Sequence, residues 1–370
     1  MALLTTAALT IAFAGCGTSS TPTEESSETT STADQELSLL DTYVSNTVIS
    51  TGSNTIIKNA EHVTYRAWFP VEAAGEYDYR FYFSNTVDST WGDGSESYVG
   101  MSGGSYTIEK ATVYDGGTEF DANVEPTVSA AVTFSGSAAK EVAPDETFWS
   151  NPVTLNVPEG HYLLWEWTVN GTNIPAISMS NLTYAYADKG DGKGFLYTNE
   201  IPVPQLVGCD RKVKTRIVTL GDSVTQGCQT SEFGYQFWAA QLLDQLGTED
   251  YSLWNLGIGY ARASDCARQG NWLNRIEADV RKITRTCTDA GIRTILWNSP
   301  PFDMTPELDG IRTAYNETVE GIAKDNGAIY FDVASLLADP SDASKTVYGQ
   351  HPNDEGGTVI TDALVKLIQE

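Results

Sequence analysis

A serine in a tight turn is the first feature of this chain that could do chemistry. Ser223 lies in the sequence Gly-Asp-Ser-Val-Thr at 221–225, directly after the apolar run 216–220. A serine that ends a buried strand exposes its hydroxyl at the edge of an α/β sheet, where such sheets carry out their reactions. The hydroxyl attacks a carbonyl carbon only if a neighbouring base accepts its proton. The turn therefore predicts a nucleophile, on condition that the chain also supplies a base.

The base has few candidates, because the chain holds three histidines. His62 and His161 lie in a half of the chain with a β-strand pattern, whereas His351 lies in the later half, in a loop bounded by glycine and proline. In a parallel sheet such loops meet at the edge where Ser223 is expected. We therefore predict that His351 accepts the Ser223 proton. A structural or solvated histidine is the alternative.

The region from 37 to 206 has the pattern of a β-sandwich. Apolar and polar residues alternate in runs such as 63–69 and 77–83, and Gly, Asn, Asp and Pro separate the runs. Short alternating runs with such breaks are typical of a sandwich of jelly-roll type. The many Tyr and Trp residues of this region predict aromatic packing in the core, with stacking on sugar rings as the alternative.

The region from 207 to 370 alternates strands with helices, which predicts an α/β domain with a doubly wound parallel sheet and helices on both faces. Strands are expected at 216–220, 252–256, 293–297 and 328–331, and helices at 235–246, 277–290, 311–326 and 357–369.

These features resemble the SGNH (GDSL) esterase/acylhydrolase family. The resemblance rests on Gly-Asp-Ser at 221–223 and on His-Pro-Asn at 351–353, and it covers the chain from about 211 to the end. It implies that Ser223 is the nucleophile, that its backbone N–H is an oxyanion donor, and that His351 is the base. The upstream sandwich also looks like the accessory domain joined to some bacterial members.

The family's second motif is a glycine in the turn after the second strand, whose N–H points at the oxyanion. We assign this role to Gly259, with Gly257 as the second choice. Glycine suits the position because the backbone must approach the oxyanion closely. An ordinary strand-to-helix turn also favours glycine.

The family's third motif is missing from this chain. No Gly-x-Asn-Asp strand occurs between 260 and 291, so the predicted sheet lacks one central strand. If the strand at 293–297 moves in beside the first strand, Asn298 takes the place of the family's third oxyanion donor. Asn271 is the other candidate, and the conservative alternative is that neither fills the role.

The family's last motif is also altered. Tyr348 stands three residues before His351, where the family has the Asp that orients the imidazole. A backbone carbonyl, Asp354 or Asp342 could hold the ring N–H instead. Loss of a triad Asp lowers kcat by as much as ~10⁴, and loss of one oxyanion donor by ~10²–10³. The sequence therefore leaves a weakened or inactive enzyme open.

Charge and composition narrow the range of partners. The chain has 22 Lys and Arg residues against 49 Asp and Glu residues, a net charge of −27. Such a field repels the phosphates of nucleic acids and of anionic lipids, and it suits a neutral substrate such as a sugar ester. No organic cofactor is implied, and no metal is expected, because Cys and His do not occur at ligand spacing.

The first 36 residues predict export. Residues 1–14 are apolar and Ala-rich, as in a signal peptide, and Phe-Ala-Gly-Cys at 13–16 resembles the lipobox of bacterial lipoproteins. We expect a lipid anchor at Cys16 that holds the protein on the outer face of the bacterial cell membrane. A plain secretion signal is the alternative. Residues 18–35 are rich in Ser, Thr and Glu and predict a disordered tether.

Four further cysteines allow one or two disulfides in an exported protein. They are Cys209, Cys228, Cys266 and Cys287. A bridge between Cys228 and Cys266 and a set of free thiols both remain open.

We expect an exported esterase that removes acyl groups, acetyl groups first of all, from carbohydrate or from another small ester. The alternative from another class is a glycan-binding surface lipoprotein whose hydrolase domain is vestigial. A third alternative is an incomplete gene model or deletion variant, which would fold poorly because a buried parallel sheet tolerates the loss of a central strand badly.

Overall fold

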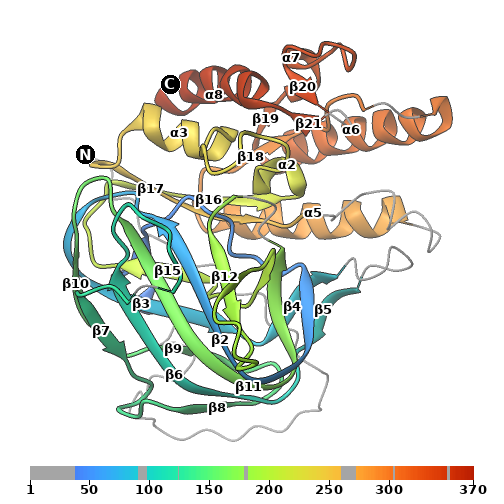
Figure 1. The fold of residues 1–370 in the computed structure, drawn as a ribbon. Coiled ribbons are helices and arrows are strands. Elements are labelled where there is room, and N and C mark those ends of the chain that lie inside the picture. The colour runs from blue at the N-terminus through green and yellow to red at the C-terminus, as the bar shows by residue number, and fades with distance from the viewer. Residues whose placement is uncertain are drawn as a thin grey trace, which may run out of the picture.

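The computed structural model of the protein describes residues 38–90, 98–123, 125–178, 182–259, 272–302, 305–347 and 351–370. A β-sandwich forms one side of the molecule, and helices with short parallel strands lie against it (Figure 1). The predicted signal peptide with Cys16 and the predicted tether lie outside the described residues, as do Cys266, Asn271 and Tyr348.

Two antiparallel sheets form the sandwich. The first has the order β1 (Val44–Ser45), β15 (Leu206–Cys209), β3 (Gly75–Ser84) and β10 (Val153–Val157), and β9 (Thr147–Trp149) also pairs with β3. The second has the order β13 (Leu196–Tyr197), β12 (Ala185–Asp188), β2 (Thr55–Pro70), β11 (Tyr162–Ser178), β6 (Tyr106–Asp115) and β7 (Ser129–Val132). Strands β14 (Glu200–Ile201) and β8 (Lys140–Val142) pair with β11 and β6, and β4 (Thr86–Thr90) pairs with β5 (Tyr98–Ser102).

Aromatic side chains fill the space between the two sheets. Along β3 every second residue is buried, which turns Tyr79, Phe81 and Phe83 inward. The Phe81 ring lies 4.6 Å from the ring of Trp165, which comes from β11 in the other sheet. Aromatic core packing is therefore the role of Tyr and Trp residues such as Tyr79 and Trp165. The jelly-roll type of the sandwich stays a prediction. Its strand β15 extends to Cys209, past the predicted boundary at 206.

The later part of the chain holds four short parallel strands and six helices among its described residues. The strands are β16 (Thr215–Gly221), β17 (Tyr251–Gly257), β18 (Ile295–Trp297) and β19 (Ile329–Phe331). The helices are α2 (Ser223–Gln226), α3 (Trp238–Leu246), α5 (Trp272–Asp289), α6 (Pro306–Asn326), α7 (Val333–Leu336) and α8 (Asp354–Gln369). A small antiparallel pair, β20 (Thr346–Val347) and β21 (His351–Pro352), precedes α8.

The predicted doubly wound parallel sheet is not confirmed, because the described parallel strands do not form one continuous sheet. Strand β16 pairs with β17, and β18 pairs with β19, and the two parallel pairs form separate sheets. Strand β18 therefore does not move in beside β16, and no described strand fills the space between the pairs. The exposed Val218 and Leu220 of β16 agree with an uncovered strand. Most strand pairs of the molecule are antiparallel.

Local signals explain why several helices differ from their predicted bounds. Helix α3 begins later than predicted because Tyr235 has a φ of 52°, outside the helical region. Helix α6 begins earlier, where Thr305 caps its N-terminus with a bond from Leu308 N–H and Pro306 follows. Helix α8 also begins earlier, capped by the Asn353 side chain.

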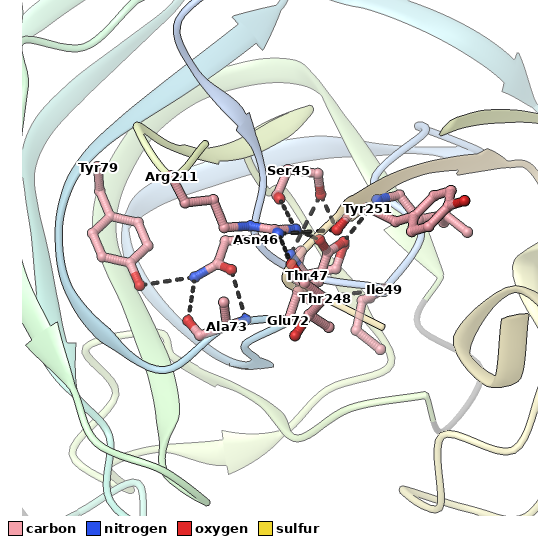
Figure 2. A network of polar contacts seen from close by, with 11 residues as sticks. Ser45, Asn46, Thr47, Ile49, Glu72, Ala73, Tyr79, Arg211, Thr248 and Tyr251 are labelled. Atoms are coloured by element: carbon pink, nitrogen blue, oxygen red, sulfur yellow. Dashed lines mark hydrogen bonds and ion pairs between the residues drawn. The ribbon is translucent and has the colours of Figure 1, made fainter. Parts of the chain in front are cut away.

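A buried side-chain pair joins the sandwich to the α/β part (Figure 2). Arg211 binds Glu72, and their side chains are 4% and 0% exposed. Arg211 also donates to the carbonyls of Thr248 (2.7 Å) and Tyr251 (3.0 Å) at the start of β17. The N–H of Leu253 in β17 donates to Glu72 at 3.3 Å. The two parts therefore share a polar joint that excludes water.

The cysteines and the helices complete the description. Cys209 and Cys287 are free thiols in the described part of the chain, and burial raises the pKa of Cys209 to about 12. Because Cys266 lies outside that part, the Cys228–Cys266 bridge stays a prediction. No described helix is long and apolar enough to cross a membrane.

Candidate active site

Ser223 lies at a sharp strand-to-helix turn. Strand β16 ends at Gly221, and the Asp222 carboxylate caps α2 by accepting a hydrogen bond from Val224 N–H at 2.9 Å. Helix α2 lasts four residues and closes at Gly227, whose φ of 103° suits glycine. A Cβ at Gly221 would overlap the Thr225 side chain, so the turn also requires glycine there. Ser223 is thus the first helical residue after the strand, as predicted.

The structure brings Ser223 and His351 together, although they are far apart in the sequence. Ser223 Oγ lies 2.8 Å from His351 Nε2, within hydrogen-bond distance. The antiparallel pairing of β20 with β21 sets Val347 opposite His351, and the capped N-terminus of α8 follows directly. The pairing of β21 with β20 and the capped start of α8 therefore hold the segment that carries His351.

No carboxylate among the described residues accepts a hydrogen bond from the second nitrogen of His351. His351 Nδ1 is buried and has no partner in the described part of the chain. Asp354 instead accepts hydrogen bonds from the N–H (2.8 Å) and the hydroxyl of Ser231. Asp342 accepts from Ser344 N–H at 3.0 Å and from Lys345 Nζ at 2.7 Å. Neither predicted substitute for the family's Asp therefore orients His351.

Asp222 is the acidic group that the sequence reasoning missed. Burial raises the pKa of its carboxyl, and the positive charge that His351 can carry acts to lower it. Burial, followed by the charge of Asp222, raises the pKa of Tyr315 in α6 to about 12. Asp222 therefore lies within electrostatic reach of the imidazole without a hydrogen bond to it. Its place directly before the serine was the available signal.

The predicted oxyanion glycine lies beside α2. Gly259 follows β17, and a Cβ there would overlap the Gln226 side-chain oxygen. A Cβ at Gly257 would overlap the backbone of Thr225 and Gln226. Gln226 has no exposed surface and donates to Ser178 O at 2.9 Å, which keeps it in place. Both glycines are thus required for close approach to the Ser223 helix, and the Gly259 N–H as oxyanion donor stays a prediction.

The Asn298 side chain is engaged in other hydrogen bonds and is not available as an oxyanion donor, which corrects the prediction. Its side-chain amide donates to Tyr330 Oη at 2.8 Å and to Asp332 Oδ1 at 2.7 Å, and its oxygen accepts from Ala334 N–H. These bonds tie the end of β18 to α7. Because both amide hydrogens are engaged, Asn298 is a structural residue here. The other candidate, Asn271, lies outside the described residues.

A loop between α2 and α3, residues 227–237, borders the dyad; we call it the active-site loop. Ser231 binds Asp354 as described, and Trp238 Nε1 donates to Val224 O at 3.1 Å just after the loop. Phe233 and Tyr235 have φ angles of 54° and 52°, uncommon for residues other than glycine. Such backbone persists only where its surroundings hold it.

Among known proteins, similarity to this chain is found in solved structures. No family model and no curated protein matches the chain. The acetyl xylan esterase AlAXEase shares 19% sequence identity, and the match covers 42% of this chain and 100% of that one with a TM-score of 0.34. A variant of an acetyl xylan esterase from Geobacillus stearothermophilus shares 16%, covering 42% and 95% with a TM-score of 0.34. A GDSL-like lipase from Bacteroides thetaiotaomicron shares 14%, covering 43% and 91% with a TM-score of 0.34.

Proposed function

We propose that this protein hydrolyses carboxylic esters with a Ser223–His351 dyad. The contact of 2.8 Å between Ser223 Oγ and His351 Nε2 carries the proposal. A base in that contact accepts the hydroxyl proton as the oxygen attacks, which is what makes serine a nucleophile near neutral pH. The residues described contain no group of three or more metal-ligating side chains. The proposed chemistry is carried by protein groups.

The reaction proceeds in two halves. Ser223 Oγ bonds to the ester carbonyl carbon while its proton passes to His351 Nε2, and the N–H groups of Ser223 and Gly259 face the oxyanion. The carbon–oxygen bond to the alcohol then breaks, and the alcohol takes the proton from His351. Water next attacks the acyl carbon and gives a proton to His351. The acid leaves as Ser223 Oγ recovers that proton.

The lack of a described carboxylate partner for His351 Nδ1 is expected to lower the rate in this scheme. The imidazole becomes positive when it holds the serine proton, and no described carboxylate is hydrogen-bonded to Nδ1 to stabilise that charge. Asp222 lies within electrostatic reach of the imidazole, and its capping bond from Val224 N–H holds its carboxyl in place. We therefore expect a working dyad with a lower kcat than a full triad.

The proposed substrate is an acyl ester, first of all an acetyl ester, on carbohydrate. A neutral sugar ester approaches a chain of net charge −27 without the repulsion that an anionic substrate meets. We also propose that the protein is exported and anchored through a lipid on Cys16. Cys16→Ala is then expected to move the protein from the membrane fraction to the soluble fraction. An unchanged distribution would contradict the anchor and leave the enzyme proposal standing.

The test of the activity is hydrolysis of p-nitrophenyl acetate by the full chain. Ser223→Ala and His351→Ala should each lower kcat by about 10³-fold or more, to a residual rate supplied by binding and the oxyanion donors. Ser341→Ala, at an exposed position in another loop, is the matched control and should retain the wild-type rate. Equal rates for wild type and Ser223→Ala would refute the proposal.

A second candidate function is glycan binding with a vestigial hydrolase, and the unpartnered His351 Nδ1 favours it. It predicts that the full chain binds a polysaccharide while releasing no more nitrophenol than Ser223→Ala does. The esterase proposal predicts the opposite for the rate. The one assay therefore separates the two functions.

A further inference from the structure

An aromatic cluster covers the outer face of the larger sheet of the sandwich. Trp68 on β2 and Leu164 on β11 point away from the main core, because side chains alternate along a strand. Half-buried aromatic rings pack around them, namely Phe120, Tyr162, Tyr184, Tyr186 and Phe195. The outer face of an antiparallel sheet is ordinarily polar. This face instead presents a second, smaller aromatic cluster.

The cluster continues onto the active-site loop of the α/β part. The Tyr184 ring is stacked between Phe120, at 3.6 Å between ring centroids, and Phe233, at 4.0 Å. The Tyr235 ring lies 6.1 Å from the Tyr162 ring. Phe233 and Tyr235 are the two aromatic loop residues with positive φ, so uncommon backbone geometry directs their rings to the sandwich.

The same loop is tied to the dyad. Ser231 binds Asp354 at the start of α8, directly after the segment that carries His351. Gln241 Nε2 donates to the Asp354 carbonyl at 3.0 Å, which fixes this corner to α3. The active-site loop therefore runs from the Ser223 helix, past the His351 segment, to the aromatic cluster. A ligand that extends from Ser223 along this loop meets the cluster.

The accessible end of the cluster is β13. Tyr197 is 49% exposed and pairs with Tyr186 on this face, whereas the neighbouring Leu196 pairs with the inward-facing Ala187 and lies on the other face of the sheet. The Tyr197 ring packs at 6.1 Å and 88° against Tyr186, which packs in turn against Trp68. Burial raises the pKa of Tyr197, and the charge of Glu232 raises it further.

We propose that Tyr197, at the exposed end of this cluster, forms a subsite that binds a sugar ring of the carbohydrate whose ester lies at Ser223. This inference rests on the proposed function. The C–H face of a pyranose is apolar and packs on an aromatic ring, while the tyrosine hydroxyl bonds to the hydroxyls of the sugar. Tyr186, itself packed against Trp68, holds the Tyr197 ring on one side, so little side-chain entropy is lost on binding. A neutral sugar also brings no charge to an acidic surface.

The test compares two substrates with Tyr197→Ala. Acetylated xylo-, gluco- and manno-oligosaccharides can reach the subsite, whereas p-nitrophenyl acetate carries no sugar. Loss of one aromatic contact is expected to raise KM for the preferred acetylated oligosaccharide by about 3- to 10-fold, with kcat changed less. Tyr197→Phe should restore most of the loss, because the ring does most of the packing. Leu308→Ala, which removes an exposed apolar side chain on α6, is the matched control.

A binding measurement tests the sugar subsite independently of ester hydrolysis. The Ser223→Ala chain is titrated with the same oligosaccharides without acetyl groups, and Tyr197→Ala is added to that background. Binding that weakens by the same 3- to 10-fold supports the subsite even if no ester is hydrolysed. A KM ratio between the substrates that stays within about twofold of wild type, or binding that Tyr197→Ala leaves unchanged, would overturn it. A wild-type chain without esterase activity would refute the proposed function alone.

Discussion

At the contact between the sandwich and the α/β part, burial and the Arg211 charge act on Glu72 in opposite directions. A pH titration of stability shows which of the two effects is larger. Burial raises the pKa of Glu72 to about 8, and the Arg211 charge and the Leu253 N–H act to lower it. Removing a carboxylate from water can cost more than a partner charge returns. Because its folded pKa lies above its unfolded value, Glu72 holds a proton in the folded state that the unfolded chain has released. Stability is therefore expected to fall as pH rises from about 4.5 to about 8.

Glu72→Gln isolates this contribution. Glutamine keeps the shape and the acceptor for Leu253 N–H but does not titrate, so the wild type should lose stability relative to the variant over that pH range. A shift from 4.5 to about 8 corresponds to at most roughly 5 kcal/mol, at about 1.4 kcal/mol per pH unit. Most of the loss should occur before pH 8, and little should follow above it.

Urea unfolding followed by tryptophan fluorescence at pH 5, 6, 7 and 8 gives the difference directly. Glu119→Gln, at an exposed position, is the control for the removal of one carboxylate and should show no such trend. A wild type that instead gains stability over Glu72→Gln as pH rises would show that the Arg211 charge outweighs burial. That outcome would refute a folded pKa of Glu72 above its unfolded value.

Three further predictions concern the site. Asp222→Asn keeps the cap of α2 but removes the charge near His351. The kcat on p-nitrophenyl acetate should therefore fall about 10-fold or more, while the stability measured by urea unfolding changes little. An unchanged kcat would contradict the role of Asp222. Asn298→Ala should lower the free energy of unfolding by about 1–3 kcal/mol, because Ala334 N–H and Asp332 lose their hydrogen-bond partner. The kcat of the folded protein should stay near the wild-type value. A fall in kcat of about 10²-fold without a loss of stability would instead show that Asn298 is an oxyanion donor. Gly257→Ala should abolish activity and lower the thermal midpoint, since its Cβ would overlap the Ser223 helix; a variant with wild-type midpoint and rate would show that α2 can shift.

Sequence reasoning reached the two residues of the dyad because each carries a local signal. Ser223 follows an apolar strand in a turn of small residues, and His351 is the one histidine of the later region. The distance between their side chains was beyond such reasoning, since it depends on how β21 and α8 are placed relative to α2. Asn298 shows the limit clearly. Its position at the end of a strand was predicted correctly, but its hydrogen-bond partners on Asp332 and Ala334 decide where its amide points.

The order of an all-β region followed by alternating strands and helices was readable from periodicity, because burial of one face imposes period 2 on a strand and about 3.6 on a helix. The separation of the parallel strands into two pairs was not, because a residue pattern identifies strands and leaves their neighbours undetermined. The Glu72–Arg211 joint and the stacking of Tyr184 between Phe120 and Phe233 join residues far apart in the sequence. Local sequence therefore specifies the elements and the candidate nucleophile and base. Tertiary packing alone decides which distant side chains meet, because contacts between them depend on the relative placement of whole elements.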